Sequence, residues 1–160
     1  MASIHVRAAT PDDIDFILAM IRGLAEYEKA LHEVEATAAQ LHDILFCQHP
    51  RVEAAIAVAD GEAVGIAVYF FNFSTWTGKL GLFLEDLYVP PEHRGRRAGI
   101  ALLKHLAQLA LDRDCGRFEW NVLDWNQPAI DLYESIGAEP MSEWIGYRLS
   151  GDALRHFAER

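Results

Sequence analysis

The sequence predicts one domain of the mixed α/β class, and three observations support that prediction. Short runs of alternating apolar residues, typical of strands, are interspersed with apolar residues at helical spacing. An Asp60-Gly61 pair between two apolar runs indicates a β-hairpin near the middle of the chain. Residues 82–123 then contain a strand, a helix and a strand, which predicts a parallel crossover.

The first half is expected to contain the antiparallel part of the sheet and two helices. Thr10, followed by Pro11 and two acids, is a helix start, and apolar residues from Ile14 to Ala25 mark one helical face. Thr37 with Gln40 three residues later predicts a capping box. The expected strands of this half are residues 4–8, 54–59 and 63–72.

The second half is expected to alternate strands and helices. A strand at 80–89 leads through a basic turn into a helix that ends near Gly116. A strand at 117–123 precedes a helix that Asn126 caps and that stops at Gly137. Residues 144–149 (WIGYRL) are expected to be a last strand, followed by a short amphipathic tail.

Composition narrows the class of protein. Apolar residues make up 51% of the 160, so a folded domain is expected, and the apolar runs are too short for a membrane span of about 20 residues. The N-terminus lacks the apolar region of a signal peptide, and Cys47 and Cys115 have no metal-binding spacing, so we expect a cytoplasmic protein without a metal. A formal charge of −10 disfavours nucleic acid and suits a cationic substrate, although acidic soluble proteins are common.

A basic turn with two glycines, Arg94-Gly95-Arg96-Arg97-Ala98-Gly99, lies between an expected strand and helix. Helix N-termini carry unpaired N–H groups that bind anions, and glycine lets the backbone approach a phosphate. The P-loop and dinucleotide-binding patterns are both absent. On local grounds the turn is either an anion site or a solvated basic turn.

Residues 84–103, LEDLYVPPEHRGRRAGIALL, resemble the cofactor motif of the GNAT family of N-acetyltransferases, whose turn follows R/Q-x-x-G-x-G/A. Arg94 and Gly99 match the ends of this pattern, whereas Arg97 stands where glycine is usual. The resemblance extends over almost the whole chain to the diamine acetyltransferases of the spermidine/spermine type, and especially to their thialysine-acetylating relatives. It rests on LAEYEKALHEV, FFNFSTWTGKLGLFLEDLYV and VLDWNQPAIDLYESIGA.

The resemblance implies a single N-acetyltransferase domain over 1–160, with a mixed sheet of about six to seven strands flanked by about four helices. It implies acetyl-CoA as co-substrate, a primary amine as acceptor and a homodimer. Glu85 is implied as the base that deprotonates the amine through water, and Tyr133 as the acid for the leaving thiolate. The same positions also suit an exposed strand carboxylate and a tyrosine that packs on the sheet.

The resemblance also implies which residues bind each of the two substrates. Arg97 is expected to serve the phosphates through its backbone, with its side chain reaching solvent or the 3′-phosphate of the nucleotide. The implied cofactor-binding residues are Leu87, Tyr88, Val89, Arg94, Gly95, Arg96, Arg97, Ala98, Gly99, Ile100, Asn126, Pro128 and Ala129. The implied amine-binding residues are Tyr27, Glu28, Trp76, Glu85, Asp86, Glu119, Trp120 and Asn121.

The sequence departs from true polyamine enzymes at the amine site. Ser74, Ile145 and Tyr147 stand where the resemblance would place an acid, an acid and a tryptophan. A long polycation needs several carboxylates along its cleft, so a short diamine or an amino-acid-like amine such as thialysine or lysine is preferred. A protein or peptide N-acetyltransferase and a non-catalytic acyl-CoA-binding module stay as alternatives.

Overall fold

The computed structural model describes residues 3–160. These residues form two compact units, one that runs to Asn121 and one from Val122 to Arg160. In the part of the chain that is described, no helix has the length and apolar character needed to cross a bilayer.

The first unit is built on a five-stranded mixed sheet in the order β1-β2-β3-β4-β5. Neighbouring strands from β1 to β4 are antiparallel, whereas β5 runs parallel to β4 after the expected crossover. Asp60 and Gly61 both take a positive φ in the β2–β3 turn, as a tight hairpin requires. The strands are β1 (Ile4–Ala8), β2 (Val52–Ala59), β3 (Glu62–Ser74), β4 (Lys79–Tyr88) and β5 (Arg117–Trp120).

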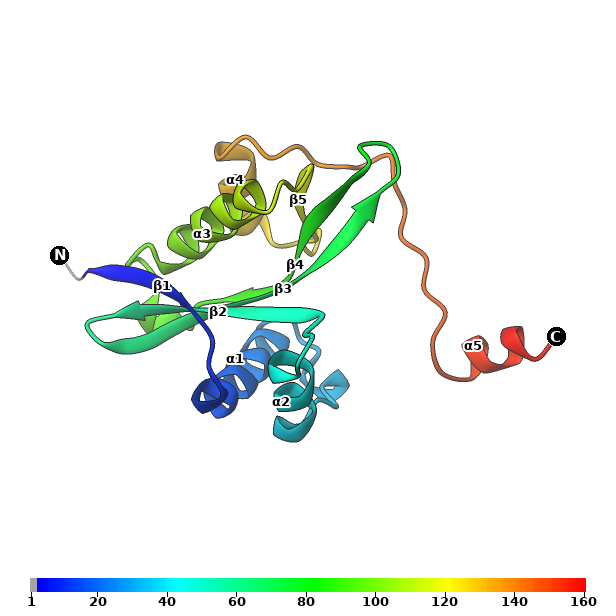
Figure 1. Ribbon diagram of the computed structural model, residues 1–160, viewed down its shortest axis with the longest axis horizontal. Coiled ribbons are helices and arrows are strands. Elements are labelled where there is room, and N and C mark those ends of the chain that lie inside the picture. Colours follow the sequence, from blue (N-terminus) through cyan, green and yellow to red (C-terminus); the bar gives the residue numbers. More distant parts are fainter. Residues whose placement is uncertain (1–2) are drawn as a thin grey trace. The chain divides into compact units, whose positions relative to one another are not determined.

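Helices cover both faces of this sheet (Figure 1). One face packs against α1 (Ile14–Tyr27) and α2 (Ala38–Phe46), and the other packs against α3 (Ala98–Asp112). Because successive strand residues point to opposite faces, the neighbours Ala55 and Ile56 serve different cores, and both are fully buried. Burying each large aliphatic side chain stabilises the fold by about 1.5–3 kcal/mol.

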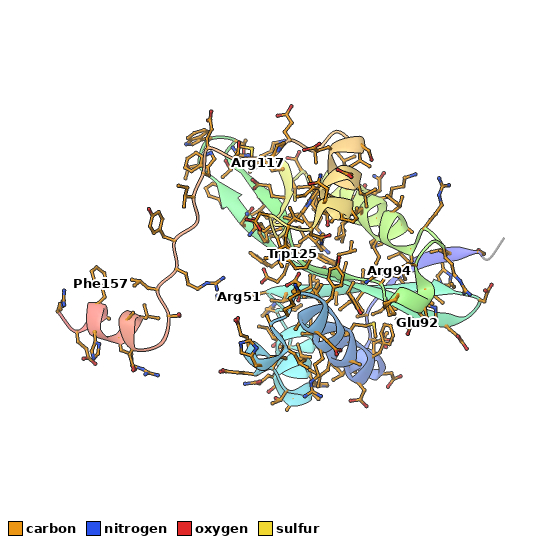
Figure 2. The ribbon with its side chains drawn as sticks, turned by 180° about the vertical axis from the view of Figure 1, so that it is seen from behind. Arg51, Glu92, Arg94, Arg117, Trp125 and Phe157 are labelled. Atoms are coloured by element: carbon orange, nitrogen blue, oxygen red, sulfur yellow. The ribbon has the colours of Figure 1, made fainter. Side chains whose placement is uncertain are left out.

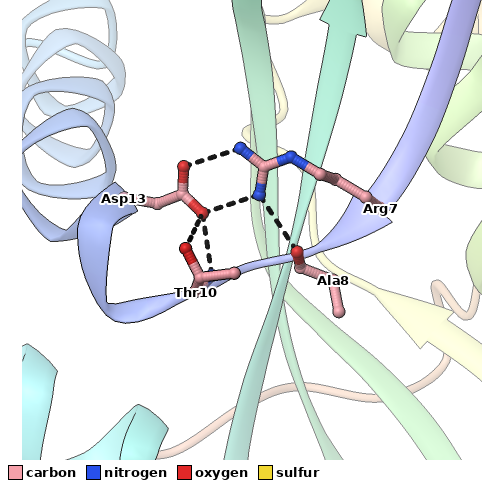
Figure 3. Close-up of polar contacts among 4 residues, drawn as sticks. All are labelled: Arg7, Ala8, Thr10 and Asp13. Atoms are coloured by element: carbon pink, nitrogen blue, oxygen red, sulfur yellow. Dashed lines mark hydrogen bonds and ion pairs between the residues drawn. The ribbon is translucent and has the colours of Figure 1, made fainter.

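The start of α1 is tied to β1 by one buried carboxylate (Figure 3). Asp13 accepts hydrogen bonds from both Nη atoms of Arg7 at 2.7 and 2.8 Å, and from the Thr10 N–H at 2.8 Å. The Arg7 guanidinium, more than any other neighbour, lowers the pKa of Asp13. The expected helix start at Thr10 is confirmed as a 3-10 turn (Pro11–Asp13) that leads into α1.

The second unit contains α4 (Gln127–Ser135) and α5 (Gly151–Ala158). The strand expected at 144–149 is wrong: these residues belong to no ladder in the described chain, and Ile145 and Tyr147 are exposed. Apolar alternation makes a segment suitable for a strand, but the strand forms only where a neighbour completes its backbone hydrogen bonds. The described residues therefore contain five strands and five α-helices, against about six to seven and about four expected.

Candidate functional site

A β-bulge interrupts β4 at Glu85. Tyr69 of β3 pairs with Leu84, and Val68 pairs with Asp86, so Glu85 has no partner of its own in that register. A bulge bends its strand and re-aims the side chains beside it, and such features gather next to active sites. The exposed Glu85 and the half-buried Asp86 therefore lie at a local distortion of the central strand.

The same part of β4 has one open edge. The parallel ladder between β4 and β5 ends at Leu84 and Trp120, while the ladder to β3 continues through Tyr88. Among residues 3–160, the ladders give Asp86 to Tyr88 no strand on the β5 side. Backbone N–H and C=O groups on such an edge can pair with an extended ligand that carries amides.

Three carboxylates interact at the end of α1. Asp86 lies on β4, next to the bulge residue Glu85, and Glu28 is the residue that ends α1. Burial, followed by the negative charges of Glu85 and Glu28, raises the pKa of Asp86 to about 6. Burial also raises the pKa of Glu28. Such a cluster favours a cation as its ligand, because an opposite charge relieves the repulsion.

The turn between β4 and α3 has the backbone of an anion site. Gly95 has φ of 81° and Arg97, the N-cap of α3, has φ of 66° and ψ of 16°. The left-handed conformation at Arg97 explains why glycine suits this position. Ala98, Gly99 and Ile100 follow in the first turn of α3, where helical N–H groups have no intrahelical acceptor and can bind an anion.

Arg94 connects this turn to two other elements. Figure 2 shows Arg94 close to Glu92 in the segment that joins β4 to α3. Its Nε donates to the Val89 carbonyl at 3.1 Å, and its Cζ lies 5.2 Å from the centroid of the Tyr27 ring. Of the sequence-predicted residues, Tyr27, Val89 and Arg94 are therefore brought together.

A shallow hollow of about 290 Å³ lies beside the turn and has three cations in its lining. Sequence reasoning missed Lys104, although it follows Arg97 by seven residues and Ile100 by four, which places all three on one helical face. Ile4 comes from β1, and no local signal could have identified it. The lining is Ile4, Arg96, Arg97, Ile100, Ala101 and Lys104.

Other predicted amine-binding residues of the first unit lie outside the carboxylate cluster. Trp76 is 80% exposed in the turn between β3 and β4. Glu119 and Trp120 are half-buried on β5, where they pair with Phe83 and Leu84, and Asn121 follows directly. These residues are therefore placed along β5, directly after it, and at the tip of the β3–β4 hairpin.

The second unit carries the remaining predicted residues on α4. Asn126 occupies the N-cap position but its side chain makes no capping hydrogen bond, which corrects the expected cap. Pro128 stands in the first turn. Ala129 and Tyr133 are one helical turn apart and both half-buried, so they share a face of α4.

The thiol, imidazole and carboxylate side chains in the part of the chain that the structure describes are not gathered in the manner of a metal site. No group of three or more His, Cys, Asp or Glu side chains there could hold a metal ion. The two cysteines, Cys47 and Cys115, are free thiols.

Comparison with known proteins identifies the family. The model of the GNAT acetyltransferase family matches residues 19–138. The chain belongs to the GNAT acetyltransferase family. It is an acetyltransferase, as the motif at 84–103 predicted, and the mixed α/β fold is confirmed.

Individual relatives refine the comparison. The chain is 41% identical to the thialysine N-ε-acetyltransferase of Sus scrofa, over 99% of each chain. It is 36% identical to a spermidine/spermine N(1)-acetyltransferase-like protein of Homo sapiens, over 91% of this chain and 22% of that one. Among solved structures, an integron cassette protein from the mobile metagenome of V. cholerae has a TM-score of 0.80 and 28% identity, over 99% of each chain.

Proposed function

We propose that this GNAT acetyltransferase transfers the acetyl group of acetyl-CoA to a primary amine of a small, amino-acid-like molecule such as thialysine or lysine. The observation that carries this proposal is the position of the carboxylates. Glu28, Glu85 and Asp86 lie where β4 is bulged, and the open edge of β4 follows at once. One strand can thereby present a cationic acceptor and an acyl donor to each other.

The residues present fit coenzyme A. The open edge of Leu87 to Val89 suits the amides of the pantetheine arm, and the turn at Arg94–Gly99 suits the pyrophosphate. Around the start of α4, Asn126, Pro128 and Ala129 are proposed to bind coenzyme A as the family resemblance implies. Acetyl-CoA, when bound, supplies the acetyl group as a reactive thioester.

Two residues of the chain are proposed to carry out the two proton transfers, one as base and one as acid. An alkyl ammonium has a pKa near 10.4, so a base must remove a proton before the nitrogen can attack. Glu85 takes that proton through water, while the charges of Asp86 and Glu28 attract and orient the ammonium. The Tyr133 hydroxyl donates a proton to the leaving sulfur, and a backbone N–H of residues 87–89 stabilises the charge that develops on the carbonyl oxygen.

The amine is proposed to be short because the acids of a polyamine cleft are missing. Ser74 ends β3, and its Oγ accepts a hydrogen bond from the Thr77 N–H of the β3–β4 turn at 3.3 Å. Ile145 and Tyr147 are uncharged. The 41% identity to a thialysine enzyme over the full chain supports the same choice. We further propose that residues 1–160 act as one catalytic domain in a cytoplasmic homodimer.

The test is acetyl-CoA consumption against a panel of thialysine, lysine, putrescine, spermidine and a basic peptide. We expect kcat/KM for thialysine or lysine to exceed that for spermidine by up to about thirtyfold, since two ion pairs are missing and each is worth up to about 1 kcal/mol. Preference for the peptide would favour a protein acetyltransferase. Binding of acetyl-CoA without transfer to any amine would refute the enzymatic proposal.

The role of Tyr133 has a matched control in the first unit. Tyr133→Phe removes the acid and is expected to lower kcat by about 10²-fold or more while coenzyme A still binds. Tyr69→Phe makes the same chemical change at a phenol whose hydroxyl donates to Glu53 Oε2 at 3.2 Å, a contact with no part in the proposed mechanism, and should leave kcat unaltered. Equal kcat values for the two variants would remove Tyr133 from the mechanism.

A further inference from the structure

We infer that Tyr27 is a positioning residue that couples the coenzyme A turn to the carboxylates of the amine site. This inference rests on the proposed function, in which the turn binds coenzyme A and the carboxylates bind the amine. Tyr27 is the last residue of α1, and Glu28 follows it directly. The guanidinium of Arg94, which belongs to the turn that follows β4, lies over the Tyr27 ring.

Arg94, an exposed side chain, makes two contacts within the protein. Its Nε donates a hydrogen bond to the Val89 carbonyl at 3.1 Å, and its Cζ lies over the Tyr27 ring, 5.2 Å from the centroid. Val89 is the last of the backbone positions proposed for pantetheine. One side chain therefore contacts the turn, the end of β4 and the end of α1.

The hydrogen bonds that end α1 are local. The N–H groups of Glu28, Lys29 and Ala30 donate to carbonyls of the preceding turn at 2.8 to 3.0 Å. They close the helix but do not reach the β4–α3 turn. The stack of Arg94 on Tyr27 joins the β4–α3 turn to the end of α1. A shift of the turn therefore also shifts Glu28, which follows Tyr27.

Movement of Glu28 has an electrostatic consequence at the amine site. The charge of Glu28 acts on Asp86, the half-buried carboxylate of the cluster. A ligand that immobilises Arg94 therefore also fixes the electrostatic field that acts on an ammonium group at the carboxylates. Because ordering the long Arg94 side chain costs entropy once, the second ligand binds to an already ordered end of α1. Linkage then requires the amine to tighten coenzyme A equally.

The test is amide hydrogen exchange at the end of α1, with coenzyme A alone as the ligand. In the wild-type chain, saturating coenzyme A should slow exchange of the Glu28, Lys29 and Ala30 amides by about two- to fivefold, the range of an exposed cation–π contact. Tyr27→Phe keeps the ring and should keep this protection. Tyr27→Leu removes the ring and should abolish it, while exchange within α3 still reports bound coenzyme A.

A matched control removes another arginine–aromatic contact of the same kind. Arg113 Cζ lies 4.7 Å from the centroid of the Phe71 ring. Phe71→Leu should lower the stability of the chain and leave the protection of Glu28 to Ala30 by coenzyme A intact. A loss of protection in this variant would mean that the effect follows general destabilisation rather than Tyr27.

A second measurement separates coupling from a merely structural role. Thialysine binding is titrated with and without coenzyme A, and the ratio of the two affinities should exceed two in the wild-type chain and approach one in Tyr27→Leu. Protection or coupling that persists in Tyr27→Leu overturns the inference, as does wild-type protein that binds coenzyme A without protecting α1. Wild-type protein that binds no coenzyme A overturns the proposed function itself.

Discussion

Replacing Arg97 by glycine and by alanine isolates the effect of its backbone conformation on stability. A non-glycine residue in the left-handed region, as at φ of 66° and ψ of 16°, costs about 1–2 kcal/mol. Glycine avoids this cost but loses about 0.5–1 kcal/mol through the greater freedom of the unfolded chain. Arg97→Gly should therefore be more stable than Arg97→Ala by about 1 kcal/mol, because both variants lack the same side chain.

Arg96 supplies the control for this comparison. It is exposed like Arg97, and it is not among the described residues with positive φ. Glycine at Arg96 should therefore be less stable than alanine by about 0.5–1 kcal/mol, the opposite sign. Urea denaturation followed by circular dichroism measures both differences, and thermal melting should show the Arg97 pair separated by about 2–4 °C. Greater stability of Arg97→Ala over Arg97→Gly would refute the reasoning.

The same variants decide what the Arg97 side chain does. If it contacts a phosphate, both Arg97 variants should bind coenzyme A about three- to fivefold more weakly than wild type at low salt, and this difference should shrink as salt rises. Unchanged affinity for coenzyme A in both variants would mean that the turn binds the phosphates without the Arg97 side chain.

Three further predictions concern the fold around the site. Asp86→Asn should be more stable than wild type at pH 7, by at most about 3 kcal/mol, because a pKa raised to about 6 makes folding less favourable as pH rises from about 4 to 6. Urea titrations at pH 4 and pH 7 should show no gain in stability at the lower pH. Asp13→Asn should lower the free energy of unfolding by about 2 kcal/mol at pH 7. Because the pKa of Asp13 is lowered in the folded chain, this loss should fade as pH falls below about 4. A loss that persists at pH 2 would contradict the ion pair with Arg7. Gly23→Ala should destabilise by about 1–3 kcal/mol despite the better helix propensity of alanine, because its Cβ would lie 2.8 Å from Cε1 of Tyr88, and a raised melting temperature would show that the ring yields freely.

Local patterns in the sequence predicted most of the first unit correctly. The hairpin at Asp60-Gly61 and the capping box of Thr37 and Gln40 depend on residues close in sequence, and both are present. The parallel crossover from β4 to β5 follows from the order of elements. Such features could be predicted because the interacting groups lie within a few residues or one connection of each other.

Features that depend on distant partners escaped prediction. The strand expected at 144–149 has the right alternation, but a ladder needs a second segment that the pattern cannot name. The bulge at Glu85 is set by the register against Val68 and Tyr69, and the stack of Arg94 on Tyr27 joins residues far apart in sequence. The residue types of the candidate site were therefore predictable, whereas the contacts that orient them were not.

The open edge of β4 has a consequence for which substitutions the acetyltransferase can accept. Leu87 and Val89 offer their backbone to the proposed cofactor, while their half-buried side chains pack against other parts of the fold: Val89 Cγ2 would lie 2.9 Å from a Cβ on Gly65, and Leu87 Cδ2 would lie 3.7 Å from a Cβ on Gly99. Selection on cofactor contact therefore constrains strand geometry rather than side-chain identity at these positions. Homologues should vary there within the limits of the core.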